Sequence, residues 1–163
     1  YFDRPDYIEA LAQSVERTLA GRRPQKLVAS YHGMPVRYLH EGDPYYCQCH
    51  KTTRLLRERL GWDEDAIDTS FQSVFGSEEW LRPYTVEHVA ELAQRGITDI
   101  AVISPAFSAD CIETLEEING EIREAFEAAG GHGFTYIPCL NDDDAHIRVL
   151  TEVIAENLAG WVE

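Results

Sequence analysis

A continuous apolar run at residues 97–104 (ITDIAVIS) constrains the fold more than any other feature of the chain. Such a run is typical of a strand that is buried on both faces of a parallel sheet. It lies between two segments whose apolar side chains recur at helical spacing; they begin at Thr85 and Ile112 and end near Gly96 and Gly130. A strand with a helix on either side predicts a parallel α/β unit.

The rest of the chain repeats this alternation. Further strands are expected at 26–31, 66–71 and 134–139, and further helices within 1–21, at 51–60 and at 142–158. Turn-rich segments at 33–46 and 72–84 are expected to be loops, and Thr85 is expected to be the N-cap of its helix. Together these elements predict an α/β fold with a parallel sheet and helices on both faces.

The length of 163 residues fits one domain, in which a leading helix (1–21) precedes an α/β domain (26–163). The only methionine is Met34, so we expect a chain that starts at Tyr1 to be a fragment of a longer protein. No apolar run approaches the roughly 20 residues of a membrane span, and we therefore expect a soluble domain.

Charge and cysteine content narrow the possible partners. The net charge is −15, with 29 acidic and 14 basic residues, and such a surface repels phosphate backbones. Nucleic acid is therefore not expected as a partner. Four cysteines, at positions 47, 49, 111 and 139, are too few and too scattered for a disulfide scaffold. We expect a reducing compartment.

Ligands of open parallel sheets bind beyond the carboxyl ends of the strands. In this chain His32 follows the first strand, residues 105–113 follow the third, and residues 139–143 follow the fourth. A histidine at such a position is a candidate general base, because its pKa lies near neutrality. The alternative is a histidine whose ring simply hydrogen-bonds a loop carbonyl.

An acidic series begins at the second of these positions. Glu113 has Asp110 three residues before it, and Glu117 and Glu121 follow at intervals of four. These carboxylates could attract or relay a divalent cation. Two alternatives stay open: Asp110 and Glu113 could be a capping pair, and the acidic face could be solvated surface.

Cysteine and nucleotide motifs give little support to other chemistry. Cys47, Cys49 and His50 suggest a metal site, but the spacing is not C-x₂-C and no second pair follows. An iron–sulfur cluster would require Cys111 and Cys139 to converge with the first two cysteines. The chain has no G-x-G-x-x-G, P-loop or G-x-S-x-G motif, so nucleotide cofactors and serine hydrolysis lack their usual signatures.

Four blocks of the sequence resemble the ferrochelatase family, and they occur in the family's order. They are residues 30–53 (SYHGMPVRYLHEGDPYYCQCHKTT), 69–85 (TSFQSVFGSEEWLRPYT), 104–118 (SPAFSADCIETLEEI) and 136–142 (YIPCLND). The first contains the His-Gly-x-Pro and Gly-Asp-Pro-Tyr patterns of bacterial members. The resemblance implies a chelatase-like (Rossmann-like) half-domain, with the N-terminal half absent from this chain and the porphyrin bound between the two halves.

The resemblance also implies an activity, which is insertion of Fe²⁺ into protoporphyrin IX to form haem in the cytoplasm. His32 and Glu113 match the family's essential histidine and glutamate, and Glu117 matches a further acidic residue. His32 is expected to accept pyrrole protons, Glu113 and Glu117 to form an acidic relay, and His32 and Glu113 to contact the metal. The substrate-pocket positions are Tyr31, Trp80 and Phe107.

No cofactor is expected to be required, with Fe²⁺ acting as a substrate. A [2Fe–2S] cluster is not expected, because no cysteine follows Cys139 where some members carry their ligands. The apolar porphyrin leaves a peripheral membrane contact open. Two alternative functions are another tetrapyrrole metal chelatase, which the Gly-Asp-Pro-Tyr block disfavours, and a non-catalytic porphyrin or haem carrier, which would tolerate loss of His32 and Glu113.

Overall fold

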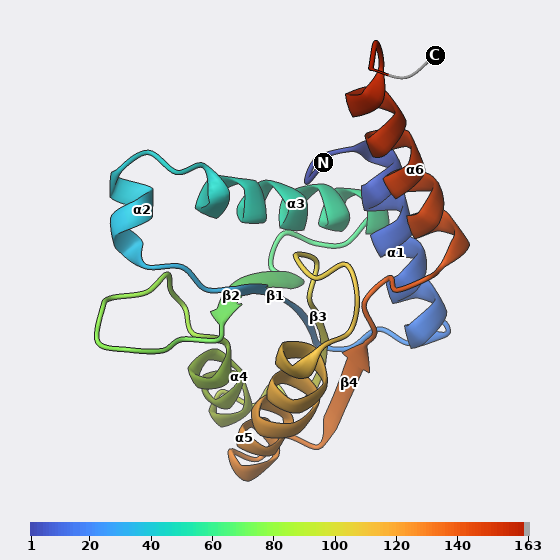
Figure 1. Cartoon of the computed structure of the whole chain (residues 1–163). Helices are drawn as coiled ribbons and strands as arrows, with labels where there is room; N and C mark the ends of the chain where they lie inside the picture. The colour runs from blue at the N-terminus through green and yellow to red at the C-terminus, as the bar shows by residue number, and fades with distance from the viewer. Residues whose placement is uncertain (162–163) are drawn as a thin grey trace.

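A computed structural model describes residues 1–161, and its centre is a four-stranded parallel sheet (Figure 1). The strands are β1 (Lys26–His32), β2 (Ile67–Gln72), β3 (Asp99–Ile103) and β4 (Gly133–Ile137), in the spatial order β2-β1-β3-β4. All pairs are parallel, with Leu27 opposite Ile67 on one side of β1 and opposite Ala101 on the other. The predicted α/β fold is confirmed.

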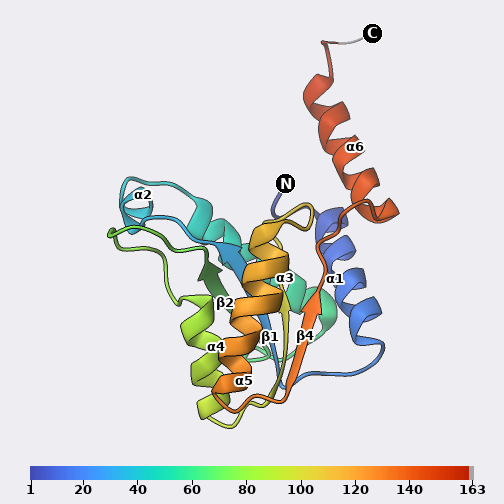
Figure 2. The same cartoon turned by 60° about the horizontal axis from the view of Figure 1, so that its bottom comes forward.

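Helices cover both faces of the sheet, as the sequence predicts. One face carries α1 (Pro5–Leu19), α3 (Tyr45–Leu60) and α6 (Asp144–Leu158). The other carries α4 (Thr85–Gln94), the π-helix η1 (Glu113–Ile122) and α5 (Arg123–Ala128). Figure 2 shows η1 and α5 running as one continuous element in front of the sheet, while α6 extends beyond the rest of the molecule.

Two hydrophobic clusters, one on each face, receive alternate side chains of β1. Leu27, Ala29 and Tyr31 pack in the cluster beneath α1 and α3, whereas Val28 packs with α4 and α5. Successive side chains of a strand point to opposite faces. Tyr31 therefore lies on the α3 side of the sheet, and His32 on the η1 side.

The structure corrects the predicted start of α3, which begins at Tyr45 and not at residue 51. The Asp43 carboxylate accepts a hydrogen bond from the Tyr45 amide at 2.8 Å, which satisfies a free N–H of the first helical turn. A short helix, α2 (Val36–His40), also occupies part of the segment that was expected to be a loop. Polar composition alone did not reveal either helix.

Thr85 is the first residue of α4, and Tyr84 is the N-cap, so the predicted capping role of Thr85 is wrong. Its Oγ1 atom lies instead 2.8 Å from Ser30 Oγ and 2.9 Å from Ser70 Oγ, fully buried between β1, β2 and α4. The hydroxyl is thus used to join the helix to two strands. Among residues 1–161, no helix combines the length and the apolar content needed to cross a bilayer.

Candidate active site

His32 is the last residue of β1, and its ring is half-buried at the carboxyl end of the sheet. Its Nδ1 atom lies 2.7 Å from the carbonyl oxygen of Gly33. Because a carbonyl only accepts, Nδ1 carries the hydrogen of this bond, and in the neutral ring the lone pair is then on Nε2. The contact agrees with the interpretation in which the ring bonds a loop carbonyl, while the role of His32 as a general base stays a prediction.

His32 shares an open cavity of about 610 Å³ with the acidic face of η1. The lining residues are His32, Ser73, Val74, Phe75, Ile112, Glu113, Glu116, Glu117 and Glu121. In a π-helix the hydrogen bonds span five residues, so side chains four positions apart remain on one face. This geometry turns Glu113, Glu117 and Glu121 toward the same cavity as His32.

Glu113 is held in its ionised form. The pKa of its carboxyl lies below the ordinary value because its own backbone N–H and the Cys111 thiol hydrogen-bond the carboxylate, and His32 adds a smaller attraction. The alternative capping pair is not observed. The Asp110 carboxylate bonds Thr114, Tyr136 and Asn141 instead.

Glu117 is anchored by the segment that follows β2. Its carboxylate accepts hydrogen bonds from the Ser73 amide and the Ser73 hydroxyl, each at 2.5 Å, and from Gln72 Nε2 at 3.2 Å. Gln72 Nε2 also donates to the Glu113 carbonyl at 2.6 Å, and its Oε1 accepts from Ser30 Oγ at 2.8 Å. The sequence interpretation missed Gln72 and Ser73, although both lie in the block at 69–85 that resembles the family.

The three substrate-pocket positions fall in three different environments. The Phe107 ring lies beside His32, with 6.2 Å between ring centroids. Trp80 is 5% exposed and packs on Phe75 at 4.9 Å, behind Gly33. Trp80 lines neither this cavity nor the neighbouring one that contains Tyr31. Phe107 is therefore the one of the three that the fold brings to His32.

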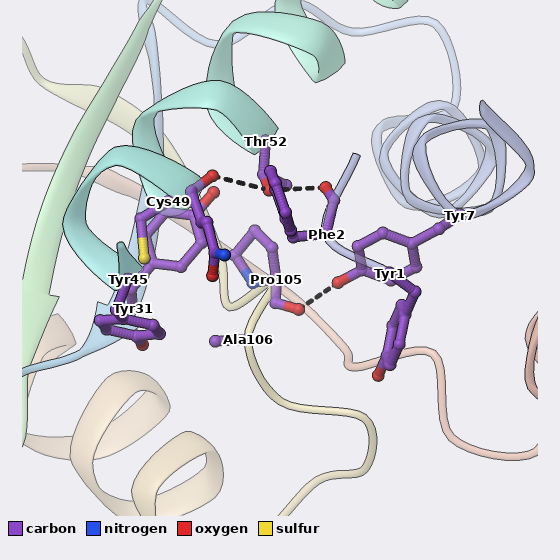
Figure 3. A pocket seen from close by; sticks show the side chains of 10 residues that line it. Tyr1, Phe2, Tyr7, Tyr31, Tyr45, Cys49, Thr52, Pro105 and Ala106 are labelled. Atoms are coloured by element: carbon purple, nitrogen blue, oxygen red, sulfur yellow. Dashed lines mark hydrogen bonds between the residues drawn. The ribbon is translucent and has the colours of Figure 1, made fainter. Parts of the chain in front are cut away.

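Tyr31 lines a second cavity, of about 400 Å³, on the α3 side of the sheet (Figure 3). Its other walls come from the start of the chain, α1, α3 and the segment after β3: Tyr1, Phe2, Tyr7, Tyr45, Gln48, Cys49, Thr52, Pro105 and Ala106. Thr52 Oγ1 donates to the Phe2 carbonyl at 2.8 Å, and the Tyr7 hydroxyl donates to the Pro105 carbonyl. Tyr45, in the wall of this second cavity, donates a hydrogen bond from its hydroxyl to the main-chain carbonyl of His32 at 2.9 Å.

The cysteines do not converge on one site. Cys47 is exposed and Cys49 is buried in α3, while Cys111 and Cys139 lie near the third and fourth strands. Within the described part of the chain, no three His, Cys, Asp or Glu side chains are grouped as metal ligands.

Comparisons with known proteins agree with these blocks and with the fold. The family model described as Ferrochelatase matches residues 1–158. A ferrochelatase of Rhodobacter capsulatus is 75% identical over 165 residues, which cover 100% of this chain and 47% of that protein. One from Marinobacter nauticus is 54% identical, over 99% of this chain and 44% of that protein. The chain thus spans about half the length of the curated relatives it matches.

Among solved structures, SirB from Bacillus subtilis with Fe³⁺ has a TM-score of 0.62 and 14% sequence identity. The match covers 97% of this chain and 57% of that one. At this identity the likeness shows a common fold only.

Proposed function

We propose a function from one premise: the chain belongs to the ferrochelatase family. In this proposal the complete protein inserts Fe²⁺ into protoporphyrin IX to form haem, and this chain supplies the C-terminal half. The observation that carries the proposal is the shared cavity, which is lined by His32, whose Nδ1 bonds a carbonyl, and by Glu113, whose carboxyl has a lowered pKa. Insertion exchanges two pyrrole protons for one metal ion, so it requires a proton acceptor beside groups that attract a cation.

His32 is the proton acceptor in this mechanism: its Nε2 takes one pyrrole proton, passes it to the carboxylates of Glu113 and Glu117, and then takes the second. A neutral imidazole takes a proton at Nε2 without bringing prior charge to the porphyrin, and the Gly33 carbonyl stabilises the resulting imidazolium through Nδ1–H. The carboxylate of Glu113, three residues after Asp110, attracts both that imidazolium and the incoming Fe²⁺. Carboxylate oxygen suits a hydrated divalent cation.

Glu117 extends the acidic path away from His32. Its carboxylate is held by Ser73 and Gln72, so it offers a fixed negative charge to protons or metal ions passing along η1. Phe107 stands beside His32 and would contact the porphyrin face. Tyr31 would face the second cavity, and Trp80 would support the loop behind Gly33.

The absent half of the protein is the proposed partner of the apolar face of α6. Ile147, Ile154 and Leu158 are exposed along this helix, where it extends beyond the rest of the molecule (Figure 2). Apolar side chains in such a row usually pack against another element. The Arg4 guanidinium bonds Glu156 at 2.6 Å. Glu156 is two residues from both Ile154 and Leu158, so this contact is on the opposite side of α6 and leaves the apolar row facing away from α1.

A peripheral membrane contact is a further part of the proposal. Phe75 is 71% exposed and Ile112 is 68% exposed, and both lie at the edge of the His32 cavity. An apolar rim there would suit transfer of an apolar porphyrin from a membrane surface. Glu78 and Glu79 in the same loop favour a neutral surface over an anionic one.

We also propose that the reaction needs no resident cofactor and that the cysteines hold no [2Fe–2S] cluster. Burial raises the pKa of the Cys49 and Cys139 thiols to about 12 each, which disfavours the thiolate that binds metals. The four free cysteines support a cytoplasmic setting.

The test is fluorescence-monitored insertion of Zn²⁺ into protoporphyrin IX by the full-length protein. Glu113→Gln should lower kcat by about 10²-fold or more while porphyrin still binds, since it removes charge and not volume. Glu124→Gln, at an exposed position on α5, is the matched control and should leave kcat unchanged. A wild-type protein that binds porphyrin without inserting metal would be a carrier.

A further inference from the structure

The side chain of Asn141, which follows β4, forms two hydrogen bonds to the segment that precedes η1. Its Oδ1 accepts a hydrogen bond from the Asp110 amide at 2.8 Å, and its Nδ2 donates to Asp110 Oδ2 at 2.7 Å. In a third hydrogen bond, the backbone N–H of Asn141 donates to the Ser108 carbonyl at 3.0 Å. The side chain and the backbone N–H of Asn141 thus hold the turn that lies between Phe107 and Glu113.

The Asp110 carboxylate, which Asn141 holds, is also hydrogen-bonded to the first turn of η1. Asp110 Oδ1 accepts a hydrogen bond from Thr114 Oγ1 at 3.1 Å, and Thr114 is fully buried. Thr114 Oγ1 in turn accepts from the Cys111 amide at 2.9 Å. Since Thr114 directly follows Glu113, the direction in which Glu113 enters the cavity depends on where Asp110 is held.

The backbone at Asn141 is itself specialised for this contact. Its φ is 49°, a left-handed conformation that asparagine adopts more readily than most residues. The His146 ring, buried at the start of α6, holds the Asn141 carbonyl at 2.8 Å from Nδ1. The backbone of Asn141 is therefore held in place, and this restricts the positions that its side-chain amide can take.

We propose that Asn141 is a positioning residue for the reaction: through its two-point contact with Asp110 it sets the place of Phe107 and Glu113 relative to His32. The inference rests on the proposed function. Asn141 does not line the His32 cavity, and its side chain reaches the first turn of η1 through Asp110 and Thr114. Displacement of a positioned group by about 1 Å can cost on the order of 10²-fold in rate.

The first test variant is Asn141→Gly in the full-length protein. Glycine keeps the left-handed backbone and the backbone bond to Ser108 available, and it removes the side-chain bonds to Asp110 and to the Cys139 carbonyl. We expect kcat for Zn²⁺ insertion to fall by about 10- to 100-fold, with the KM for protoporphyrin within about threefold of wild type. Ala20→Gly, at the left-handed C-cap of α1, is the matched control and should leave both parameters unchanged.

A reciprocal exchange separates positioning from loss of fold. Asp110→Asn and Asn141→Asp each break the complementary pair, whereas the double variant restores one donor and one acceptor between the same two positions. We expect the double variant to regain at least tenfold over the weaker single variant. Recovery would not follow from a general loss of stability, and absence of recovery would overturn the proposal, even if Asn141→Gly fails to fold.

Amide hydrogen exchange distinguishes this proposal from the proposed function. Asn141→Gly should speed exchange in residues 108–117 and leave α4 and α5 protected as in wild type. Unchanged exchange there, or unchanged kcat in an active protein, overturns the role of Asn141. If wild-type protein inserts no metal, the proposed function fails, and the reaction role of Asn141 fails with it, while faster exchange would still show that Asn141 holds η1.

Discussion

The Nδ1 atom of His32 lies 2.7 Å from the carbonyl oxygen of Gly33, the next residue in the chain. This contact fixes the ring tautomer with a bond to the main chain, so it depends on the turn at Gly33 and on no other side chain. This turn lies at the start of the His-Gly-x-Pro sequence. The Gly33 amide fixes it to β2 by donating a hydrogen bond to the Gln72 carbonyl at 2.7 Å. The geometry of the proposed base is therefore determined by how β1 ends beside β2.

Replacing His32 by alanine should remove the proton acceptor and lower kcat for Zn²⁺ insertion by about 10²- to 10⁴-fold. Full-length protein and a fluorescence assay with protoporphyrin IX are suitable. His40→Ala, at an exposed position in α2, should leave the rate within about twofold of wild type. Equal rates for the two variants would remove His32 from the mechanism.

Gly33→Ala should destabilise the protein because its new Cβ would meet fixed atoms. It would lie 2.8 Å from the Gln72 carbonyl oxygen and 3.0 Å from a ring carbon of Trp80. We expect the free energy of unfolding to fall by about 1–3 kcal/mol, measured by urea denaturation. Gly120→Ala, in η1, has open space around its Cβ position and should not destabilise. A neutral Gly33→Ala would mean that the Trp80 loop moves freely.

Gln72→Met keeps the length of the side chain and removes its hydrogen bonds to Ser30, Glu113 and Glu117. Gln72 is 2% exposed, so the lost partners are not replaced by water, and we expect about 1–3 kcal/mol less stability. The rate of metal insertion should also fall, since Glu117 loses a donor. Gln94→Met, at an exposed position at the end of α4, is the control. Equal denaturation midpoints for the two variants would contradict the role of Gln72.

Asp68, on β2, should make stability depend on pH in the acid range. Burial alone would raise the pKa of its carboxyl, but the hydrogen bond from His88 at 3.0 Å and the charge of Lys26 at 3.3 Å lower it overall. A lowered folded-state pKa contributes stability that is present above the unfolded value of about 3.9 and is lost as pH falls through the folded value.

The corresponding measurement compares wild type with Asp68→Asn from about pH 6 to about pH 2. The stability advantage of wild type should be constant above about pH 5 and should shrink below about pH 4. Asp65→Asn, which changes an exposed side chain, should show no such convergence. An advantage that persists to pH 2 would mean that the Asp68 contacts do not stabilise the ionised form.

The sequence predicts the four strands and the longer helices in their order, because buried apolar side chains recur at strand or helix spacing, but it does not predict α2. The run at 97–104 contains β3, and the helical spacing from Ile112 onward marks the element that became η1 and α5. Because ligands of parallel sheets bind beyond the carboxyl ends of the strands, the sequence also predicts that His32 and Glu113 lie at the same edge of the sheet. The start of α3 was missed because its first turn depends on the Asp43 carboxylate, which a polarity pattern does not distinguish from a loop.

Sequence by itself determined the α/β alternation, the two cluster-forming faces and the two principal candidates, His32 and Glu113. Only the tertiary structure decided that Tyr31 and His32 serve different cavities, that Trp80 is buried behind Gly33, and that Gln72, Ser73 and Asn141 hold the acidic helix. The physical reason is the separation along the sequence of the residues that interact. Apolar periodicity is a property of neighbouring residues, whereas these hydrogen bonds join segments that are 31 to 45 positions apart and meet only through the strand order β2-β1-β3-β4.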